Sequence, residues 1–425
     1  MPLTVDFKNE SYMRISPFDG YIVDADKAAQ VVSPAYDALT PVQRHHFALT
    51  HPQNYLNVMR SREEFPENEC PSLTALLATN SARLKRMIDE KDFVYQQTPS
   101  FYIYRLSDQG HIQTGLVTEI PITEYESGLV KKHEFTQASK EDDLTFYQQK
   151  VRASSSPMCL TYLPDPHIDE CISTLCRREP VLDFADSDGL RQTVWVIADA
   201  ESIARLQALF SRVPTSYLTD GHHRAASAAR FRDIERAANP NHCGSEPYNF
   251  LLVALFPSNQ LRILEYNRCV DGLNGKSAGE FLQALTSKFE LESCDGQPAR
   301  WVRPRARGEF ALFCDGIWYR LTSRKEFVPH DLVGALDVSI LQDRILKPIL
   351  GISDPRSDPR ISYLSGAFDM MELEAHCREN NLLGFAVYST AIEDLIAVAD
   401  AGDIMPPKST WFDPKLRSGI FLRMR

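Results

Sequence analysis

The alternation of apolar and polar positions divides the chain into strands and helices of ordinary length. FVYQQTPSFYIYRLS, IQTGLVTEIPI and PMCLTYL carry aromatic and β-branched residues in the patterns typical of strands. From Pro71, apolar residues of PSLTALLATNSARLKRMIDEK recur at the spacing that predicts an amphipathic helix. Strands and helices do not alternate strictly, which favours an α+β fold, or a mixed α/β one, with mixed sheets flanked by helices.

Capping and turn residues predict where several of these elements begin or end. Thr40 followed by Pro41 predicts a helix start, and Ser139 is the predicted cap of a helix over SKEDDLTFYQQKVRA. Asp315 and Gly316 predict the turn of a hairpin. LRILEYNRCV is predicted as one strand and DVSILQDRILKPILG as one helix.

Length and charge restrict the class of protein. A chain of 425 residues is long for a single core and predicts two domains. We place one over 1–274 and an α+β domain over 275–425, whose end (400–425) returns to the first. The formal charge of -11 argues against nucleic acid and anionic lipid as partners.

Neither a membrane span nor a secretory leader is predicted. No run approaches the roughly 18 apolar residues that a span needs, and the N-terminal segment lacks the apolar core of a signal peptide. The nine cysteines form no CxxC pair. We therefore expect a reduced, cytoplasmic protein.

The strongest chemical signal is the segment YLTDGHHRAASAARF. A strand ending at Asp220 and Gly221, followed by a helix beginning near Arg224, would present backbone N–H groups that bind phosphate. Gly221 permits close approach, Arg224 suits phosphate oxygens, and His222 and His223 can donate hydrogen bonds or exchange protons. Asp220 could orient a histidine or hold phosphate-bound Mg²⁺. The alternative is that Asp220 caps the helix and the histidines lie on a solvated first turn.

Three other segments supply weaker candidates, each with an ordinary structural alternative. In KKHEFTQASKEDDLTF, Glu134 is a candidate general base and Lys140 a candidate phosphate contact, although a solvated helix start explains both. Lys408, Ser409 and Thr410 form either a phosphate-binding loop or a surface turn, and they lack the glycines of a Walker A loop. Asp37, in VVSPAYDAL, could be a helix cap.

Taken together, these motifs resemble one family. SPAYDALT, HPQNYLNVMR, HEFTQASKEDD, TDGHHRAASA, EPYNFLLVAL, LKPILGI and MPPKSTWFDPK are similar to the successive signatures of the domain of unknown function 1015 family, over residues 14–423. The Asp-Gly-His-His-Arg motif is also similar to the phosphate-binding turn of the ParB/sulfiredoxin-like superfamily, which includes sulfiredoxins, CTP-binding partitioning proteins and free-serine kinases. The second resemblance implies a ParB/sulfiredoxin-like core with a C-terminal elaboration.

The residues discriminate among the activities that this superfamily implies. His222 stands where a sulfiredoxin has its nucleophilic cysteine, and the acidic charge disfavours DNA. A kinase remains, transferring phosphate from ATP or ADP, with Mg²⁺, to a small hydroxyl compound such as free serine. Residues 221–224 would hold the phosphates, Glu134 or, as second choice, Asp37 would be the base, and Lys408 or Lys140 the cation near the transferred group. A nucleotide sensor that changes shape or dimerises, and a phosphoester hydrolase with a histidine base, are the alternatives.

Overall fold

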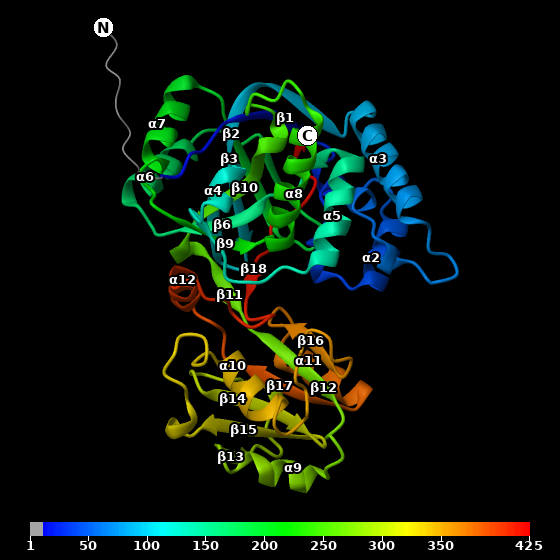
Figure 1. Cartoon of the computed structure of the whole chain (residues 1–425), viewed down its shortest axis with the longest axis vertical. Helices are drawn as coiled ribbons and strands as arrows, with labels where there is room; N and C mark the ends of the chain where they lie inside the picture. Colours follow the sequence, from blue (N-terminus) through cyan, green and yellow to red (C-terminus); the bar gives the residue numbers. More distant parts are fainter. Residues whose placement is uncertain (1–11) are drawn as a thin grey trace. The chain divides into compact units, whose positions relative to one another are not determined.

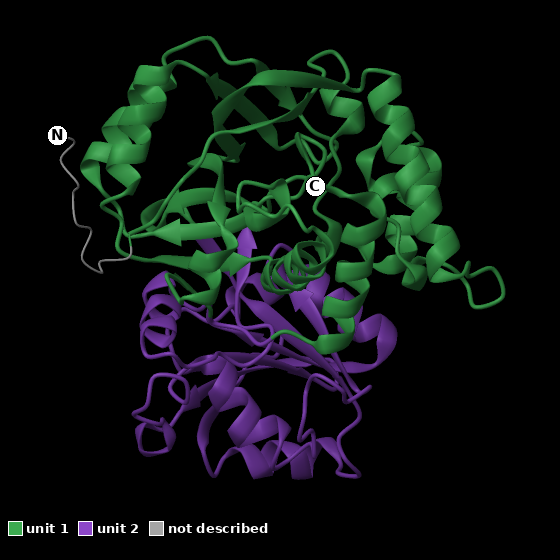
Figure 2. Ribbon diagram, turned by 45° about the horizontal axis from the view of Figure 1, so that its top comes forward, with its two compact units in different colours: residues 1–132, 136–261, 414–425 green, residues 133–135, 262–413 purple. Residues whose placement is uncertain are grey.

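The computed structural model describes residues 12–425, which form two compact units. The first unit comprises the chain up to Lys132, Thr136–Leu261 and Pro414–Arg425, and the second comprises His133–Phe135 and Arg262–Asp413 (Figure 2). The units divide at residues 261 and 413, whereas the sequence predicts a boundary at residue 274 and a return of the chain at residue 400.

The first unit is built on one large mixed sheet (Figure 1). Its order is β4-β9-β6-β10-β3-β2-β1-β19-β5, and β8 pairs with β2 and β7. The pairs β4–β9 and β6–β10 are parallel and the others antiparallel. The strands are β1 (Phe18–Val23), β2 (Phe93–Asp108), β3 (His111–Pro121), β4 (Val130–Lys131), β5 (Ala153–Ser154), β6 (Met158–Tyr162), β7 (Leu182–Ala185), β8 (Arg191–Ile197), β9 (Ser216–Asp220), β10 (Phe250–Pro257) and β19 (Phe421–Met424).

Helices cover this sheet, so both of its faces are buried. They are α1 (Ala28–Val31), α2 (Pro41–Thr50), α3 (Leu73–Asp89), α4 (Ile122–Glu126), α5 (Ala138–Val151), α6 (Pro166–Leu175), α7 (Ala200–Phe210) and α8 (His222–Ala238). Successive residues of β2 join different cores: Phe101 and Ile103 pack with residues of α6, α7 and α8, whereas Tyr102 and Tyr104 pack with residues of α1 and α3. The period of two along a strand therefore gives the unit a core on each side of its sheet.

The second unit has a six-stranded antiparallel sheet, in the order β13-β15-β14-β17-β12-β16, and a separate two-stranded β11–β18 ribbon. The strands are β11 (Arg262–Leu264), β12 (Tyr266–Asp271), β13 (Phe289–Ser293), β14 (Glu309–Cys314), β15 (Ile317–Ser323), β16 (Ile361–Ser365), β17 (Leu382–Val387) and β18 (Trp411–Asp413). The helices are α9 (Ala278–Leu285), α10 (Asp337–Leu341), α11 (Met370–Asn380) and α12 (Ile392–Asp400). The α+β class with mixed sheets is thus confirmed.

Three sequence predictions need correction. Helix α5 begins at Ala138 with Gln137 in the cap position, so Ser139 lies inside the helix and is not its cap. The segment LRILEYNRCV forms two strands, β11 and β12, that belong to different sheets. The predicted helix after Asp337 is α at first and then a π-helical turn over Gln342–Leu346. No described helix is both long enough and apolar enough to cross a membrane.

A buried carboxyl group in the second unit gives a prediction about stability. Burial raises the pKa of Asp337 to about 7; the Gly308 N–H, which donates to it at 2.9 Å, and Arg307 lower the pKa, while Asp394 and Glu309 raise it. A raised folded-state pKa means that this contribution to stability is full below about pH 4 and is lost as the pH rises through 7.

Asp337→Asn is therefore expected to stabilise the second unit at pH 8, relative to wild type, by roughly 2 to 4 kcal/mol. At pH 4 the difference should nearly vanish, because the wild-type carboxyl is then protonated in the folded state and, close to its ordinary pKa, about half protonated in the unfolded state. Urea unfolding of the full chain at the two pH values measures both differences. An equal difference at the two values would contradict the assignment.

Candidate functional site

The predicted phosphate-binding segment forms a tight turn between a buried strand and a long helix. β9 ends at Asp220, Gly221 occupies the cap position with φ 101° and ψ 27°, and α8 begins at His222. A Cβ at Gly221 would lie 3.0 Å from Nη2 of Arg224 and 3.1 Å from Cγ of Met158. Both the positive φ and the close neighbours therefore require glycine at this position.

The N-terminus of α8 carries the backbone donors that the sequence predicted. Its first intrahelical bond runs from the Ala225 N–H to the Gly221 carbonyl at 2.9 Å. Gly221, as the cap residue, has no side chain that could accept a bond from the first amides. The amides of residues 222–224 precede this bond, as the first amides of any α-helix do. Together with the helix dipole, they give this end of α8 a positive partial charge suited to an anion.

Arg224 binds within the protein. Its Nη1 donates to the carbonyls of Ser156 and Pro157, at 2.6 and 3.0 Å, and its Nη2 donates to Oδ2 of Asp220 at 2.6 Å. These three bonds fasten the start of α8 to the end of β9 and to the loop before β6. Arg224 thus organises the turn, in addition to any contact with a ligand.

Lys415 is a functional candidate that the sequence analysis missed. Its Nζ lies 2.6 Å from Oδ1 of Asp220 and 2.9 Å from Oδ2 of Asp37. The Lys415 side chain is 11% exposed, whereas that of Asp37 is 50% exposed. Lys415 ends the motif MPPKSTWFDPK, whose neighbouring hydroxyl groups favour Lys408 as the sequence-based candidate. The network brings together Asp37 and Asp220, which are both candidates from the sequence.

The charges of this network reinforce one another. Burial alone would raise the pKa of Asp220, but Lys415 and Arg224 outweigh it and hold this pKa well below its usual range. Burial likewise disfavours the Lys415 ammonium, but Asp220 and Asp37 outweigh it and raise the pKa of Lys415 above its usual value. The Asp220 carboxylate and the Lys415 ammonium therefore stay charged at neutral pH.

The neighbouring thiol is not a nucleophile at neutral pH. Cys159 on β6 pairs with Asp220 across the sheet, and its carbonyl accepts a bond from the Thr219 hydroxyl at 2.9 Å. Burial raises the pKa of the Cys159 thiol to about 12. Because the thiolate is the reactive form of cysteine, this side chain acts as a small buried group.

His223 links the starts of two helices. Its Nε2 accepts a hydrogen bond from the backbone N–H of Gln137, the cap residue of α5, at 3.1 Å. The same two helices are joined further along by the Gln148 side chain, which donates to the Ser227 hydroxyl at 2.9 Å. His222, by contrast, is buried. The two histidines of the motif therefore occupy different environments.

The remaining predicted site residues come from other segments of the sequence. Lys140 is exposed on the first turn of α5. Glu134 belongs to the short segment that clusters with the second unit. Lys408, Ser409 and Thr410 also belong to that unit, where the Lys408 carbonyl accepts a bond from Arg268 at 3.0 Å. The roles of these residues in a site with Gly221 stay predictions.

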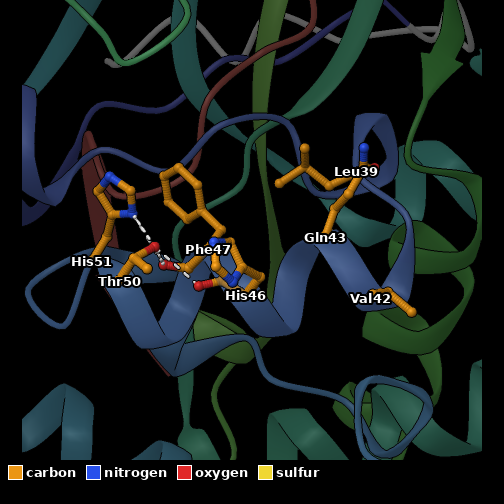
Figure 3. A pocket seen from close by; sticks show the side chains of 7 residues that line it. All are labelled: Leu39, Val42, Gln43, His46, Phe47, Thr50 and His51. Carbon is orange, nitrogen blue, oxygen red and sulfur yellow. Dashed lines mark hydrogen bonds between the residues drawn. The ribbon is translucent and has the colours of Figure 1, made fainter.

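A separate, open pocket of about 460 Å³ lies on α2 of the first unit (Figure 3). Its lining is mainly apolar, and the Phe47 and His51 rings stack beside it with their centroids 4.0 Å apart. The pocket contains none of the predicted site residues. It is lined by Leu39, Val42, Gln43, His46, Phe47, Thr50 and His51.

Comparisons with known proteins concern both sequence and structure. A family model described as "Protein of unknown function (DUF1015)" matches residues 15–339. No curated protein matches the sequence significantly. Among solved structures, the chain is similar to a free serine kinase in complex with AMP, at 12% identity and a TM-score of 0.36, over 70% of this chain and 86% of that one.

Two further solved structures are similar to the same extent. One is a conserved hypothetical protein from Pyrococcus furiosus, at 12% identity and a TM-score of 0.34, over 70% of this chain and 90% of that one. The other is SbnI with a C-terminal truncation from Staphylococcus aureus, at 10% identity and a TM-score of 0.36, over 70% and 82%. At these TM-scores the likenesses carry no argument about what this chain binds or does.

Proposed function

We propose that this chain, which belongs to the DUF1015 family as its motifs predicted, is a nucleotide-dependent small-molecule kinase. Membership of that family does not by itself assign an activity. It would transfer a phosphoryl group from ATP or ADP to a small hydroxyl compound such as free serine. The nucleotide and this class of acceptor come from the resemblance of the Asp-Gly-His-His-Arg motif to the ParB/sulfiredoxin-like superfamily.

One observation carries the proposal: the glycine-capped start of α8 adjoins a buried ammonium group. Gly221 caps the helix with a positive φ, and Asp220, next to it in the sequence, holds Lys415. Backbone donors and a fixed cation are the groups that stabilise phosphate charge during transfer. In that reaction the acceptor hydroxyl oxygen bonds to phosphorus, the bond to the nucleotide leaving group breaks, and a carboxylate takes the hydroxyl proton.

Asp220 and Asp37 would have different roles in this reaction. Both oxygens of Asp220 already accept bonds from cations, Lys415 and Arg224, so its role is to position these two groups. Asp37 has a half-exposed carboxylate and is available as base or as an oxygen ligand of the Mg²⁺ that accompanies a nucleotide. Carboxylate oxygens are ligands that Mg²⁺ prefers, and the bound ion would neutralise charge on the phosphates. Glu134 as base, and Lys408 or Lys140 as a further cation, complete the proposal.

Calorimetric titration with ATP, ADP and CTP in the presence of Mg²⁺ tests nucleotide binding. We expect saturable binding to the wild-type chain and binding weakened roughly 10- to 100-fold in His223→Ala, the factor for one hydrogen bond to a charged group. His46→Ala, an exposed histidine on α2, is the matched control and should bind like wild type. Absence of binding to the wild-type chain, or equal loss in both variants, would refute the proposed phosphate site.

A metabolite panel then separates catalysis from the alternatives. A product carrying one added phosphate, detected by mass spectrometry with ATP or ADP present, is the expected result for a kinase. Nucleotide binding without turnover of any hydroxyl compound would indicate a sensor instead. Phosphate release from a phosphoester in the absence of nucleotide would indicate a hydrolase.

A further inference from the structure

A buried arginine holds the loop that carries Asp37. This loop is the single turn Tyr36–Ala38. Nη1 of Arg44, on α2, donates to the Tyr36 carbonyl at 3.2 Å and to the Leu39 carbonyl at 2.8 Å. The two carbonyls flank Asp37 in the sequence, so one guanidinium group holds the backbone on both sides of it.

Further contacts keep Arg44 itself in place. Its guanidinium carbon lies 4.0 Å from the centre of the Tyr36 ring, and the residue is 4% exposed. It forms ion pairs with Glu63 and with Glu64, whose side chain is fully buried. The Tyr36 hydroxyl donates to the hydroxyl of Ser61 at 2.8 Å, and Ser61 lies in the same short segment as Glu63 and Glu64. Such a desolvated, charge-paired guanidinium is a rigid support for the loop.

Arg60 provides a natural comparison within the same cluster. It forms an ion pair with Glu64, contacts Nδ1 of His45 at 3.0 Å and lies over the Phe65 ring. It shares the Glu64 carboxylate with Arg44, but its hydrogen bonds go to Glu64 and His45 and none goes to Tyr36–Leu39 in the described chain. Replacing Arg60 therefore disturbs the cluster without releasing the loop.

We propose that Arg44 is a positioning residue: by binding the carbonyls of Tyr36 and Leu39 it keeps the Asp37 carboxylate against the Lys415 ammonium. The consequence for turnover rests on the proposed function, whereas the contact itself does not. Released from Arg44, the loop would let Asp37 move away, and Lys415 would retain Asp220 as its remaining carboxylate partner in the network.

The reactivity of Lys415 toward acetic anhydride, followed by mass spectrometry, tests the contact without any assay of activity. An ammonium that loses one of two carboxylates has a lower pKa and reacts faster, by about tenfold per pKa unit. Arg44→Lys keeps a positive charge but cannot bind both carbonyls while stacking on Tyr36. We expect it to accelerate labelling of Lys415 about threefold to tenfold, as Asp37→Asn does, whereas Arg60→Lys leaves the rate unchanged.

The double variant makes the test specific. If Arg44 acts through Asp37, adding Arg44→Lys to Asp37→Asn should not accelerate labelling further. The proposal would be overturned if the effects of Arg44→Lys and Asp37→Asn on the labelling rate were additive. It would also be overturned if Arg44→Lys and Arg60→Lys changed the rate equally, or if Arg44→Lys left it unchanged. If Arg44→Lys does not fold, hydrogen exchange of the wild type decides. The Ala38 amide, which donates to the Ala35 carbonyl at 3.1 Å, should then be protected, and rapid exchange there would overturn the proposal.

Kinetics extend the test to the proposed reaction. With a nucleotide and an acceptor that support turnover, Arg44→Lys should lower kcat about as much as Asp37→Asn does and leave KM for the nucleotide within about twofold. The double variant should lose no more than Asp37→Asn alone. A wild-type chain without turnover would refute the kinase and leave the labelling result standing, so the two failures are distinguishable.

Discussion

Lys415→Met is expected to weaken nucleotide binding by about 100-fold or more and to destabilise the first unit by roughly 3 kcal/mol at pH 7. The substitution keeps most of the side-chain volume but removes the cation between Asp37 and Asp220. Asp37 then loses its ammonium partner in the network and Asp220 retains Arg224 alone of the two cations, next to the turn that would receive the phosphates. Removing one partner of a buried ion pair costs more than the pair itself contributes, because the other charges stay desolvated. Asp37 is half exposed, which places the expected cost at the lower end of the usual range.

The pH dependence gives this prediction a second readout. The folded-state pKa of Asp220 is lowered, so its contribution to stability is present above about pH 4 and is lost as the pH falls through the folded value. The folded-state pKa of Lys415 is raised, so its contribution is present below about pH 10 and is lost only above it. The penalty of Lys415→Met should therefore be constant from about pH 6 to pH 9 and shrink toward pH 3.

Urea unfolding across this range measures the penalty, and calorimetry measures nucleotide affinity. Lys27→Met is the matched control, because Lys27 pairs with Asp92 at 2.8 Å but its side chain is 39% exposed. It should cost much less stability than Lys415→Met and leave nucleotide affinity unchanged, because exposed ion pairs contribute little. A similar penalty for the two variants, or a Lys415→Met penalty that does not decline in acid, would contradict the network.

Gly221→Ala is expected to destabilise the first unit by roughly 2 to 3 kcal/mol and to abolish phosphate binding at the turn. A φ of 101° is strained for alanine. In addition, the new methyl group would lie 3.0 Å from Nη2 of Arg224. That nitrogen cannot move away without loosening its bond to Asp220, so the substitution disturbs the charge network as well as the backbone.

A substitution at a second glycine separates the cost of backbone strain from the cost of crowding by the new methyl group. Gly244 has a φ of 92° but nothing within 4 Å of the position of an added Cβ. Gly244→Ala should therefore show only the cost of backbone strain, about 1 kcal/mol, and should leave nucleotide affinity unchanged. The excess cost in Gly221→Ala, measured by urea unfolding, reports the crowding against Arg224 and Met158. Equal costs and equal affinities in the two variants would contradict the special role of this turn.

Local sequence signals predicted the elements whose causes are local. Thr40 and Pro41 predicted the start of α2, and the structure shows Thr40 and Gln43 in a reciprocal capping box. Asp315 and Gly316 predicted the hairpin turn between β14 and β15, and both adopt positive φ. Ser139 led to a wrong helix start because serine is a common cap residue but here lies inside the first turn of α5. The actual cap residue, Gln137, makes no side-chain hydrogen bond that the sequence could have indicated.

The candidate site depends on contacts that no local pattern encodes. The turn at Gly221 was predictable because strand, glycine and helix are adjacent in the sequence. Lys415 was not, since it reaches Asp220 from 195 positions away, and no periodicity marks that pairing. The same holds for Arg44, which looks like any basic residue on an amphipathic helix until its two carbonyl partners are seen.

The order of segments along the chain also affects how the first unit is assembled during translation. Strand β19 pairs with β1 on one side and β5 on the other, and Lys415 precedes it in the same returning segment. Residues 262–413, which form most of the second unit, are therefore synthesised before the first unit can complete its sheet. Until then β1 has an unpaired edge, which is prone to intermolecular pairing. A nascent chain that stalls within the second unit would thus lack both the lysine of the site and the strand that closes this edge.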